Sequence, residues 1–196
     1  MIPPITPAVK NLLIINIFVF FSLGITSMQI PRIADFMILH NYQSPYFYPF
    51  QFVSTMFTHA TLGHIFFNML MLYFFGPLVE NRIGSKKTFI AYLFGGLFAA
   101  IVYFVVFSFF KVQSFGLLGA SGAVYTIVVL GALYFPNMKA GLLLIPVRFP
   151  LAYMAAGFIT IDILAMMFGR GTGIAHLAHL GGAALGFILY YIWEKR

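Results

Sequence analysis

The sequence predicts an all-α polytopic membrane protein, a bundle of six transmembrane helices. Three observations predict this fold class: 62% of the residues are hydrophobic, only 8% are charged, and the mean hydropathy is +0.98. These values lie outside the range of soluble globular domains and inside that of polytopic membrane proteins. The chain has no cysteine, which excludes disulfides, thiolate nucleophiles and cysteine metal ligands.

Charged residues divide the chain into apolar stretches of the length that a transmembrane helix needs, about 20 residues. The first lies between Lys10 and Arg32, is longer than the apolar core of a signal peptide, and has no small-residue cleavage site, so we expect a span and not a leader. All six spans are expected to belong to one membrane domain, residues 1–196. The expected spans cover residues about 11–28, 61–79, 88–110, 117–135, 151–168 and 173–193.

Residues 29–58 are the longest segment outside these spans. They are rich in Pro, Tyr, Phe and Gln. The prolines and polar residues interrupt any spanning helix, and the aromatic content is too high for an ordinary aqueous loop. Aromatic residues concentrate at the membrane–water interface. We therefore expect an interfacial loop that lies partly in the membrane surface.

The Lys and Arg residues indicate the orientation, because short cytoplasmic loops carry an excess of them. With both termini in the cytoplasm, eight of the 11 basic residues lie inside, and only Arg32, Lys111 and Arg170 lie outside. Scattered between apolar spans, these charges account for the net charge of +7 without a nucleic-acid partner. The inner set is Lys10, Arg82, Lys86, Lys87, Lys139, Arg148, Lys195 and Arg196.

Spans two, four and six then run from outside to inside, and polar residues occur in the first part of each. At 1.5 Å rise per residue, each polar residue lies roughly 5–10 Å below the outer surface. A random scatter of polar residues would seldom reach such a common depth. The residues are His64, Asn68, Ser121 and His179.

Ser121 is a candidate nucleophile. Gly119 and Gly122 flank it and leave its hydroxyl accessible. The pattern departs from the G-x-S-x-G elbow of soluble hydrolases, because Ala123 stands at the last glycine position. Taken alone, a serine in a membrane helix more often bonds its own backbone or eases helix packing.

His179 is the candidate base, which a serine hydroxyl needs because it is a weak nucleophile unaided. Gly182 and Gly186 form a G-x-x-x-G face one turn later that could bring the sixth span against the fourth. Tyr125 could support the imidazole by stacking. No carboxylate is adjacent in sequence to orient the ring, so a Ser-His dyad is expected in preference to a triad.

His64 and Asn68 are four residues apart and face one way on a helix. Two side-chain donors on one face suit an oxyanion hole, in which each donor is worth roughly 3–4 kcal/mol of transition-state stabilisation. The backbone N–H of Ser121, near a helix start, could add a third donor.

Two other interpretations stay open at this point. His59, His64, His176 and His179 could ligate zinc, but no H-E-x-x-H is present and the few acids do not join the histidines, so no metal is expected. Asp162, the only acid inside a span, could pair with a neighbouring helix, take part in gating, or serve a proton relay in a small transporter. Interfacial hydrogen bonding is the plainer role for His59 and His176.

Taken together and in this order, the motifs resemble those of the rhomboid intramembrane serine proteases, from about residue 45 to 193. Each motif is weak by itself, and the set on the appropriate spans is specific. The motifs are His59-x4-His64-x3-Asn68, Glu80-x-Arg82-x-Gly84, Gly119-Ala120-Ser121-Gly122 with Tyr125, and Ala178-His179-x-x-Gly182-x-x-x-Gly186.

The resemblance implies an endopeptidase without a cofactor that cleaves transmembrane protein substrates near the outer face of the bilayer. Ser121 would be the nucleophile and His179 the general base, with His64, Asn68 and the Ser121 amide binding the oxyanion and Tyr125 packing on His179. The fifth span would be the lateral gate, and the protein the minimal six-helix bacterial form in the inner membrane. The alternative is an inactive relative that binds membrane helices. The oligomeric state stays open.

Overall fold

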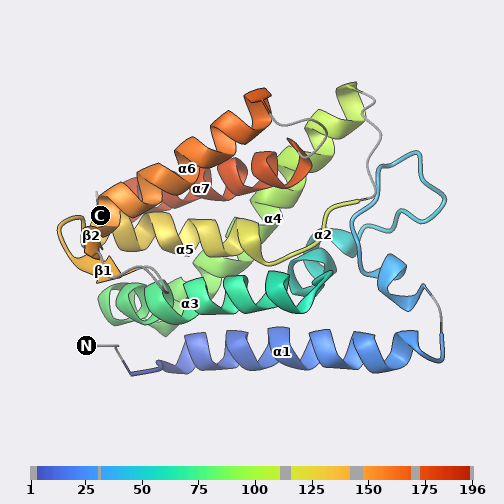
Figure 1. Cartoon of the computed structure of the whole chain (residues 1–196), viewed down its shortest axis with the longest axis horizontal. Helices are drawn as coiled ribbons and strands as arrows, with labels where there is room; N and C mark the ends of the chain where they lie inside the picture. The colour runs from blue at the N-terminus through green and yellow to red at the C-terminus, as the bar shows by residue number, and fades with distance from the viewer. Residues whose placement is uncertain (1–3, 31, 111–115, 142–147, 169–172, 195–196) are drawn as a thin grey trace.

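A computed structural model of the chain describes residues 4–30, 32–110, 116–141, 148–168 and 173–194 (Figure 1). Short helical segments η1 (Ile33–Phe36), α2 (Gln51–Ser54) and η2 (Thr55–Phe57) follow the first long helix, and an antiparallel pair of strands, β1 (Lys139–Gly141) and β2 (Arg148–Pro150), precedes α6. The long helices are α1 (Pro7–Ser27), α3 (Leu62–Ile83), α4 (Ser85–Phe110), α5 (Ser121–Tyr134), α6 (Leu151–Phe168) and α7 (Gly173–Glu194).

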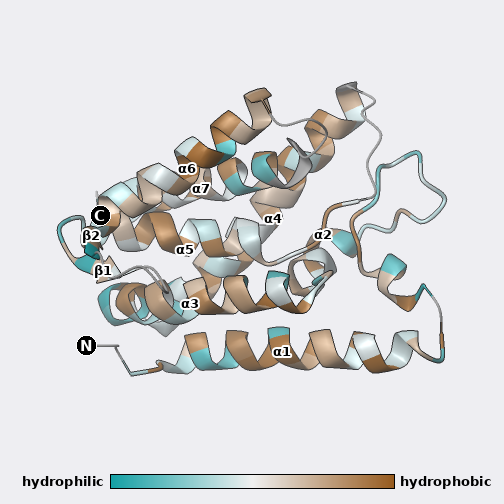
Figure 2. Ribbon diagram, in the orientation of Figure 1, coloured by the Kyte–Doolittle hydropathy of each residue, from teal (hydrophilic) through white to brown (hydrophobic). Residues whose placement is uncertain are grey.

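These helices run in alternating directions, so both chain termini lie at the same end of the molecule (Figure 1). Hydrophobic residues line the helices, and hydrophilic residues gather around β1 and β2 (Figure 2). In the described residues, α1, α3, α4 and α6 are long and apolar enough to cross a membrane. The fold is thus a membrane helix bundle, and the number of six spans and the cytoplasmic position of the termini remain predictions.

The observed helix bounds follow the expected spans closely, with differences that have physical causes. Helix α6 has the expected bounds, whereas α1 and α4 begin earlier than expected, at Pro7 and Ser85. Basic side chains near a helix end extend toward water without stopping the helix. Among the charges that indicated orientation, four lie outside the described residues: Lys111, Arg170, Lys195 and Arg196.

The expected start of the fourth span at residue 117 is wrong, because α5 begins at Ser121. Leu117 instead pairs with Leu39 as an isolated antiparallel bridge, with N–H to oxygen distances of 2.9 and 3.0 Å. Gly116 and Gly119 have φ angles of +105° and +119°, which an α-helix does not permit. The helix that carries Ser121 is therefore only 14 residues long.

Helix α5 occupies the centre of the bundle and packs against α3, α4, α6 and α7 (Figure 1). Its contact with α7 is made backbone to backbone, because a Cβ on Gly182 would collide with the carbonyl oxygen of Gly122. One turn further, a Cβ on Gly186 would lie 3.0 Å from the backbone carbonyl oxygen of Thr126. The Thr126 hydroxyl donates a hydrogen bond of 2.7 Å to the Gly182 carbonyl, which joins the two helices.

Glu80 ties the start of α1 to the end of α3, at the end of the molecule where the chain begins. This buried carboxylate accepts hydrogen bonds from the Thr6 hydroxyl at 2.5 Å and from the backbone N–H groups of Ala8 and Val9 at 2.9 Å each. The Ser85 hydroxyl adds a fourth at 2.6 Å. An acid at a helix N-terminus satisfies free N–H groups and complements the helix dipole.

The segment 29–58 lies at the opposite end, where α3 and α5 begin (Figure 1). It is built around buried Gln51, whose amide donates to the Phe36 and Tyr46 carbonyls at 3.2 and 2.7 Å. Thr55 holds the chain just before α5, because its hydroxyl donates to the Leu117 carbonyl and its own carbonyl accepts from the Gly119 N–H at 2.9 Å. The location of the segment 29–58 at the membrane interface remains a prediction.

Candidate active site

A cavity of about 430 Å³ opens between α3, α5, α6 and α7. It brings together His64, Asn68, Ser121 and His179, which come from three helices far apart in sequence. Its other lining residues are Gly63, Phe67, Met71, Val124, Tyr125 and Phe158. The cavity is thus mostly apolar, with a few polar groups converging in it, which is the usual character of a small-molecule or catalytic site.

Ser121 is the first residue of α5, so the backbone N–H groups around it lack intrahelical partners. The N–H of Ala120 is directed to the Nε2 atom of His59, at a distance of 3.4 Å. Gly119, held by Thr55, takes the positive φ that lets the chain turn sharply into the helix. These contacts position Ser121 at the cavity and leave its own N–H near the hydroxyl.

His64 packs over Gly119, beside Ser121. A Cβ on Gly119 would lie 2.7 Å from His64 Nε2 and 3.7 Å from Ser121 Oγ, so both side chains flank this glycine. Thr61 caps the start of α3, and its hydroxyl oxygen accepts the His64 N–H at 3.1 Å. Glycine is required here both for its backbone conformation and for the space that the imidazole fills.

Asn68 lies one turn after His64 on the same face of α3. Its Nδ2 donates to the His64 carbonyl at 2.9 Å, which fixes the side-chain amide. A carboxamide NH2 carries two hydrogens, so one donor is left for the cavity. Both side chains line the cavity that Ser121 also lines, and their role as oxyanion donors remains a prediction.

His179 is held face to face against Tyr125, with the ring centroids 4.5 Å apart and the planes 14° from parallel. Tyr125 lies one turn after Ser121 on α5. Stacking on a residue of this helix orients the imidazole relative to the serine, and offset-stacked rings add to the stability of the packing.

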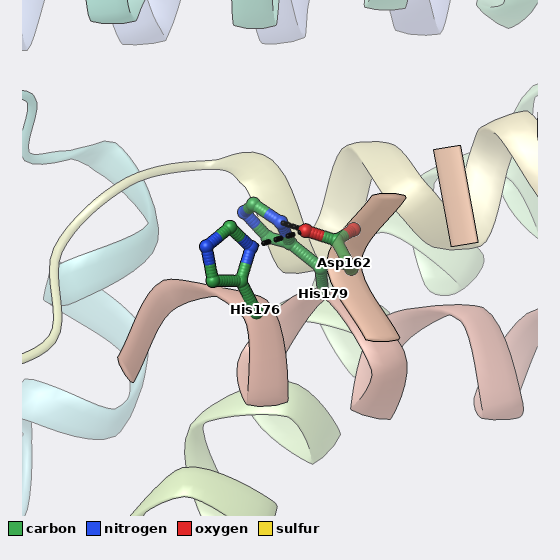
Figure 3. Close-up of side chains that lie close together, drawn as sticks. All are labelled: Asp162, His176 and His179. Atoms are coloured by element: carbon green, nitrogen blue, oxygen red, sulfur yellow. Dashed lines mark hydrogen bonds and ion pairs between the residues drawn. The ribbon is translucent and has the colours of Figure 1, made fainter. Parts of the chain in front are cut away.

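Asp162 on α6 contacts the same imidazole, as Figure 3 shows. Its Oδ1 atom lies 3.1 Å from His179 Nδ1 and 2.5 Å from His176 Nδ1. Asp162 is only 3% exposed. The expectation that no carboxylate orients His179 is therefore wrong: an acid 17 residues earlier reaches it across two packed helices.

These three residues are also the one group in the described part of the chain whose ligand atoms could hold a metal ion, all within 4.8 Å of one another. The separations of 2.5 and 3.1 Å from Asp162 are hydrogen-bond distances, so hydrogen bonds account for the cluster without an ion. His59 and His64 are not part of the group. The absence of a metal stays a prediction.

His59 lies just before α3 and is buried, and it makes a hydrogen bond as expected, although its interfacial location remains a prediction. Its ring meets the His64 ring edge-on, with centroids 5.1 Å apart. Burial, with nearby His64 as the second cause, lowers the pKa of His59 from 6.5 to about 4. The neutral ring can then accept the Ala120 N–H through Nε2, which supports the start of α5.

Two contributors to the site were not assigned from the sequence. Asp162 carried one usable signal, as the only acid within a span, and the proposed pairing with a neighbouring helix is what the structure has. His59 carried a signal as the first residue of the His59-x4-His64-x3-Asn68 motif, but its partner Ala120 is distant in sequence and could not be predicted.

Comparison with known proteins identifies the family to which the chain is similar. The family model described as "Rhomboid domain" matches residues 47–196. The chain is 31% identical over 173 residues to the chloroplastic rhomboid-like protein 11 of Arabidopsis thaliana, covering 85% of this chain and 59% of the relative. It is 32% identical over 158 residues to the rhomboid protease GlpG of Serratia proteamaculans (strain 568), covering 78% and 51%.

A mitochondrial relative, the presenilin-associated rhomboid-like protein A of Danio rerio, is 31% identical over 153 residues, covering 74% of this chain and 39% of the relative. The chain thus spans about two fifths to three fifths of the length of these relatives. They come from chloroplast, mitochondrion and a bacterium, so the similarity does not assign the chain to a bacterial inner membrane.

Proposed function

We propose, from the premise that this chain belongs to the rhomboid family, that it is a serine endopeptidase that cleaves transmembrane helices inside the membrane, near the outer face. One observation carries the proposal: Ser121, His179, His64 and Asn68 line a single cavity although they come from three separate helices. A nucleophile, a base and donors for the developing charge are the minimum set for acyl transfer.

In the first step the Ser121 Oγ attacks the carbonyl carbon of the scissile peptide. His179 takes the hydroxyl proton as the Oγ–C bond forms, and then gives it to the leaving amine nitrogen as the C–N bond breaks. Water hydrolyses the acyl-enzyme by the same route and restores the serine. Peptide hydrolysis of this kind needs no cofactor.

The carbonyl oxygen becomes negative during attack, and three donors are available to it at the cavity. His64 and Asn68 line the cavity from α3, and the Ser121 N–H lies at the start of α5. Donors held in place in a site of low dielectric stabilise such an oxyanion strongly, because they need not reorganise during the reaction. The fixed amide of Asn68, bonded to the His64 carbonyl, fits this role.

The short central helix supports a site below the membrane surface. With 14 residues α5 is about 21 Å long, against a hydrocarbon thickness of about 30 Å. If its C-terminal end is at the cytoplasmic surface, Ser121 lies several ångströms inside the outer surface. Helices α5 and α7 would complete the six spans, and α6 would be the lateral gate.

Substrates of such a site are transmembrane segments that can be locally unwound. A continuous helix hides its carbonyls in its own hydrogen bonds, and in lipid those bonds have no replacement. Segments with small or helix-breaking residues near the outer face therefore make the best substrates.

The test is labelling of the purified chain by a fluorophosphonate serine probe, together with cleavage of a model transmembrane substrate in detergent. Wild type should label and cleave, and Ser121→Ala and His179→Ala should do neither, with Thr126→Ser as a matched control that keeps both activities. Cleavage that persists in Ser121→Ala would contradict the proposal. A folded wild type that never labels favours the alternative, a catalytically inactive protein that binds membrane helices.

A further inference from the structure

Asp162 is exceptional within its own helix. From residue 156 to the end of α6 at residue 168, it is the one buried residue, while neighbours such as Ile161, Ile163 and Leu164 are exposed. An aspartate is costly to place in an apolar helix and is normally kept there for a specific partner. Here the apolar residues face outward, as contact with lipid favours, and the acid faces the bundle, where its partners lie.

The partners of Asp162 determine the tautomer of His179. An ionised carboxylate only accepts hydrogen bonds, so the Nδ1 atoms of His176 and His179 must both carry hydrogens to bind Oδ1. In neutral His179 the hydrogen then sits on Nδ1, and Nε2 is left as the only ring nitrogen able to accept a proton from Ser121. The opposite tautomer could not act as the base.

Two helices together fix the orientation of the ring. Tyr125 on α5 fixes its plane by stacking, and Asp162 on α6 fixes its rotation through Nδ1. The titratable groups that face Asp162 are His176 and His179 on α7 and Tyr125 on α5. His176 is not among the residues that line the cavity, so its hydrogen bond serves the carboxylate and not the substrate.

We infer that Asp162 is a positioning residue for His179, so that the site operates as a Ser121–His179–Asp162 relay and the reactivity of Ser121 depends on the position of α6. This inference rests on the proposed function. When His179 takes the Ser121 proton on Nε2, its Nδ1–H stays with the carboxylate, which remains ionised and stabilises the imidazolium. No proton passes to Asp162, and the proton leaves with the amine product.

The arrangement also couples α6 to catalysis. In the apolar 18-residue window of each helix, 22% of the residues are buried in α6, as in α1, against 44% in α3 and 39% in α4, so α6 is held to the bundle less extensively than α3 or α4. An outward movement of α6 would withdraw the carboxylate from His179 while leaving Ser121, Tyr125 and the oxyanion donors in place. Ser121 would then persist without an oriented base.

The inference is tested on the purified full chain with two readouts. The first is the rate of fluorophosphonate labelling at Ser121 in wild type, Asp162→Asn, Asp162→Glu and His176→Gln. The second is the 15N spectrum of the histidine rings, which reports which nitrogen carries the hydrogen; with five histidines in the chain, His176→Gln and His179→Gln samples assign the resonances.

We expect Asp162→Asn to label about 100-fold more slowly, Asp162→Glu to recover part of that loss, and His176→Gln to stay within about threefold of wild type. The spectrum should show His179 as the Nδ1–H tautomer in wild type, and a mixture of tautomers in Asp162→Asn. A purely structural role for Asp162 would leave the tautomer unchanged.

Two results would overturn the inference. One is an Nε2–H tautomer for His179 in the wild type, which needs no variant to fold. The other is a folded Asp162→Asn protein that labels at the wild-type rate. Failure of the wild type to label, with the Nδ1–H tautomer intact, would instead count against the proposed function and leave the positioning contact standing.

Discussion

Glu80 and Asp162 are both carboxylates buried in an apolar bundle, 4% and 3% exposed, but their partners differ in kind. Glu80 accepts from two hydroxyls and two backbone N–H groups, none of which changes protonation at ordinary pH. Asp162 accepts from two imidazoles, the side chain that most often transfers protons in catalysis. The first acid joins helix ends, and the second lies beside a candidate base.

The difference distinguishes a structural acid from one with a chemical role. A buried charge must be paired or fully hydrogen-bonded in either case, so burial alone does not separate the two. What separates them is whether the partners can take part in proton transfer. Perturbed or histidine-linked acids in a cavity are candidates for function, whereas acids that cap a helix start are explained by the helix.

The largest effect is expected from matched amide substitutions at the two acids. Asp162→Asn should slow Ser121 labelling about 100-fold, because the carboxylate that orients His179 is lost, while Glu80→Gln should stay within about threefold. Labelling rates at equal protein concentration in one detergent measure both. Equal losses in the two variants would remove the distinction between the acids.

For stability we expect the opposite order, with the larger loss in Glu80→Gln and the smaller loss in Asp162→Asn. Glu80→Gln places an NH2 group against N–H donors of Ala8 or Val9, and we expect it to reduce the free energy of unfolding by about 2 kcal/mol. Thermal or denaturant unfolding in detergent measures this change. Ser85→Ala, which removes a single donor, is the matched control and should cost less. A Glu80→Gln protein as stable as wild type would contradict the assignment of Glu80 as a structural anchor.

A neutral hydrogen bond between helices should matter less than either acid. Thr126→Val keeps the shape of the side chain but removes the bond to the Gly182 carbonyl, and the expected loss of stability is about 0.5–1 kcal/mol. Thr126→Ser keeps the hydroxyl and should stay closer to wild type. A loss as large as that of Glu80→Gln would show that charge is not what makes the Glu80 contacts strong.

At neutral pH the smallest effect concerns His59, a buried group whose protonation is opposed by its surroundings and which affects stability only as the pH falls. Its pKa is lowered to about 4 in the folded protein, against 6.5 when unfolded, so between these values the unfolded chain binds the proton and the folded chain does not. Stability contributed by this residue is therefore lost as pH falls from 6.5 toward 4. Unfolding temperatures measured across this range should fall less steeply in His59→Gln, and an unchanged slope would contradict the argument.

Much of the fold could be predicted from the sequence because hydrophobic length and loop charge report it directly. The bounds of α6 match the expected 151–168. The start of α5 could not be predicted from hydropathy, because Leu117 is as apolar as a helix residue. The chain before Ser121 is not helical because Leu117 pairs with Leu39 and two glycines take positive φ angles. Both features depend on distant parts of the chain.

The candidate site could also be predicted only in part. Ser121, His179, His64 and Asn68 could be selected because each lies at a similar distance from a span end, and helix rise converts that distance into depth. The contact of Asp162 with His179 could not be predicted, because it depends on the rotation of α6. A helix that is apolar on nearly every side has no periodic pattern to show which face meets its neighbours.

The bridge between Leu39 and Leu117 has a consequence for how the protein matures. Helices α5 and α7 can insert and pack through their own glycines, but the backbone shape just before Ser121 comes from the segment 29–58, through Leu39 and Thr55. A newly inserted chain would thus hold its serine and histidine together before the neighbouring amide donors are aligned. On the proposed function, docking of that segment would be the step that completes the active site, and activity would arise late in biogenesis.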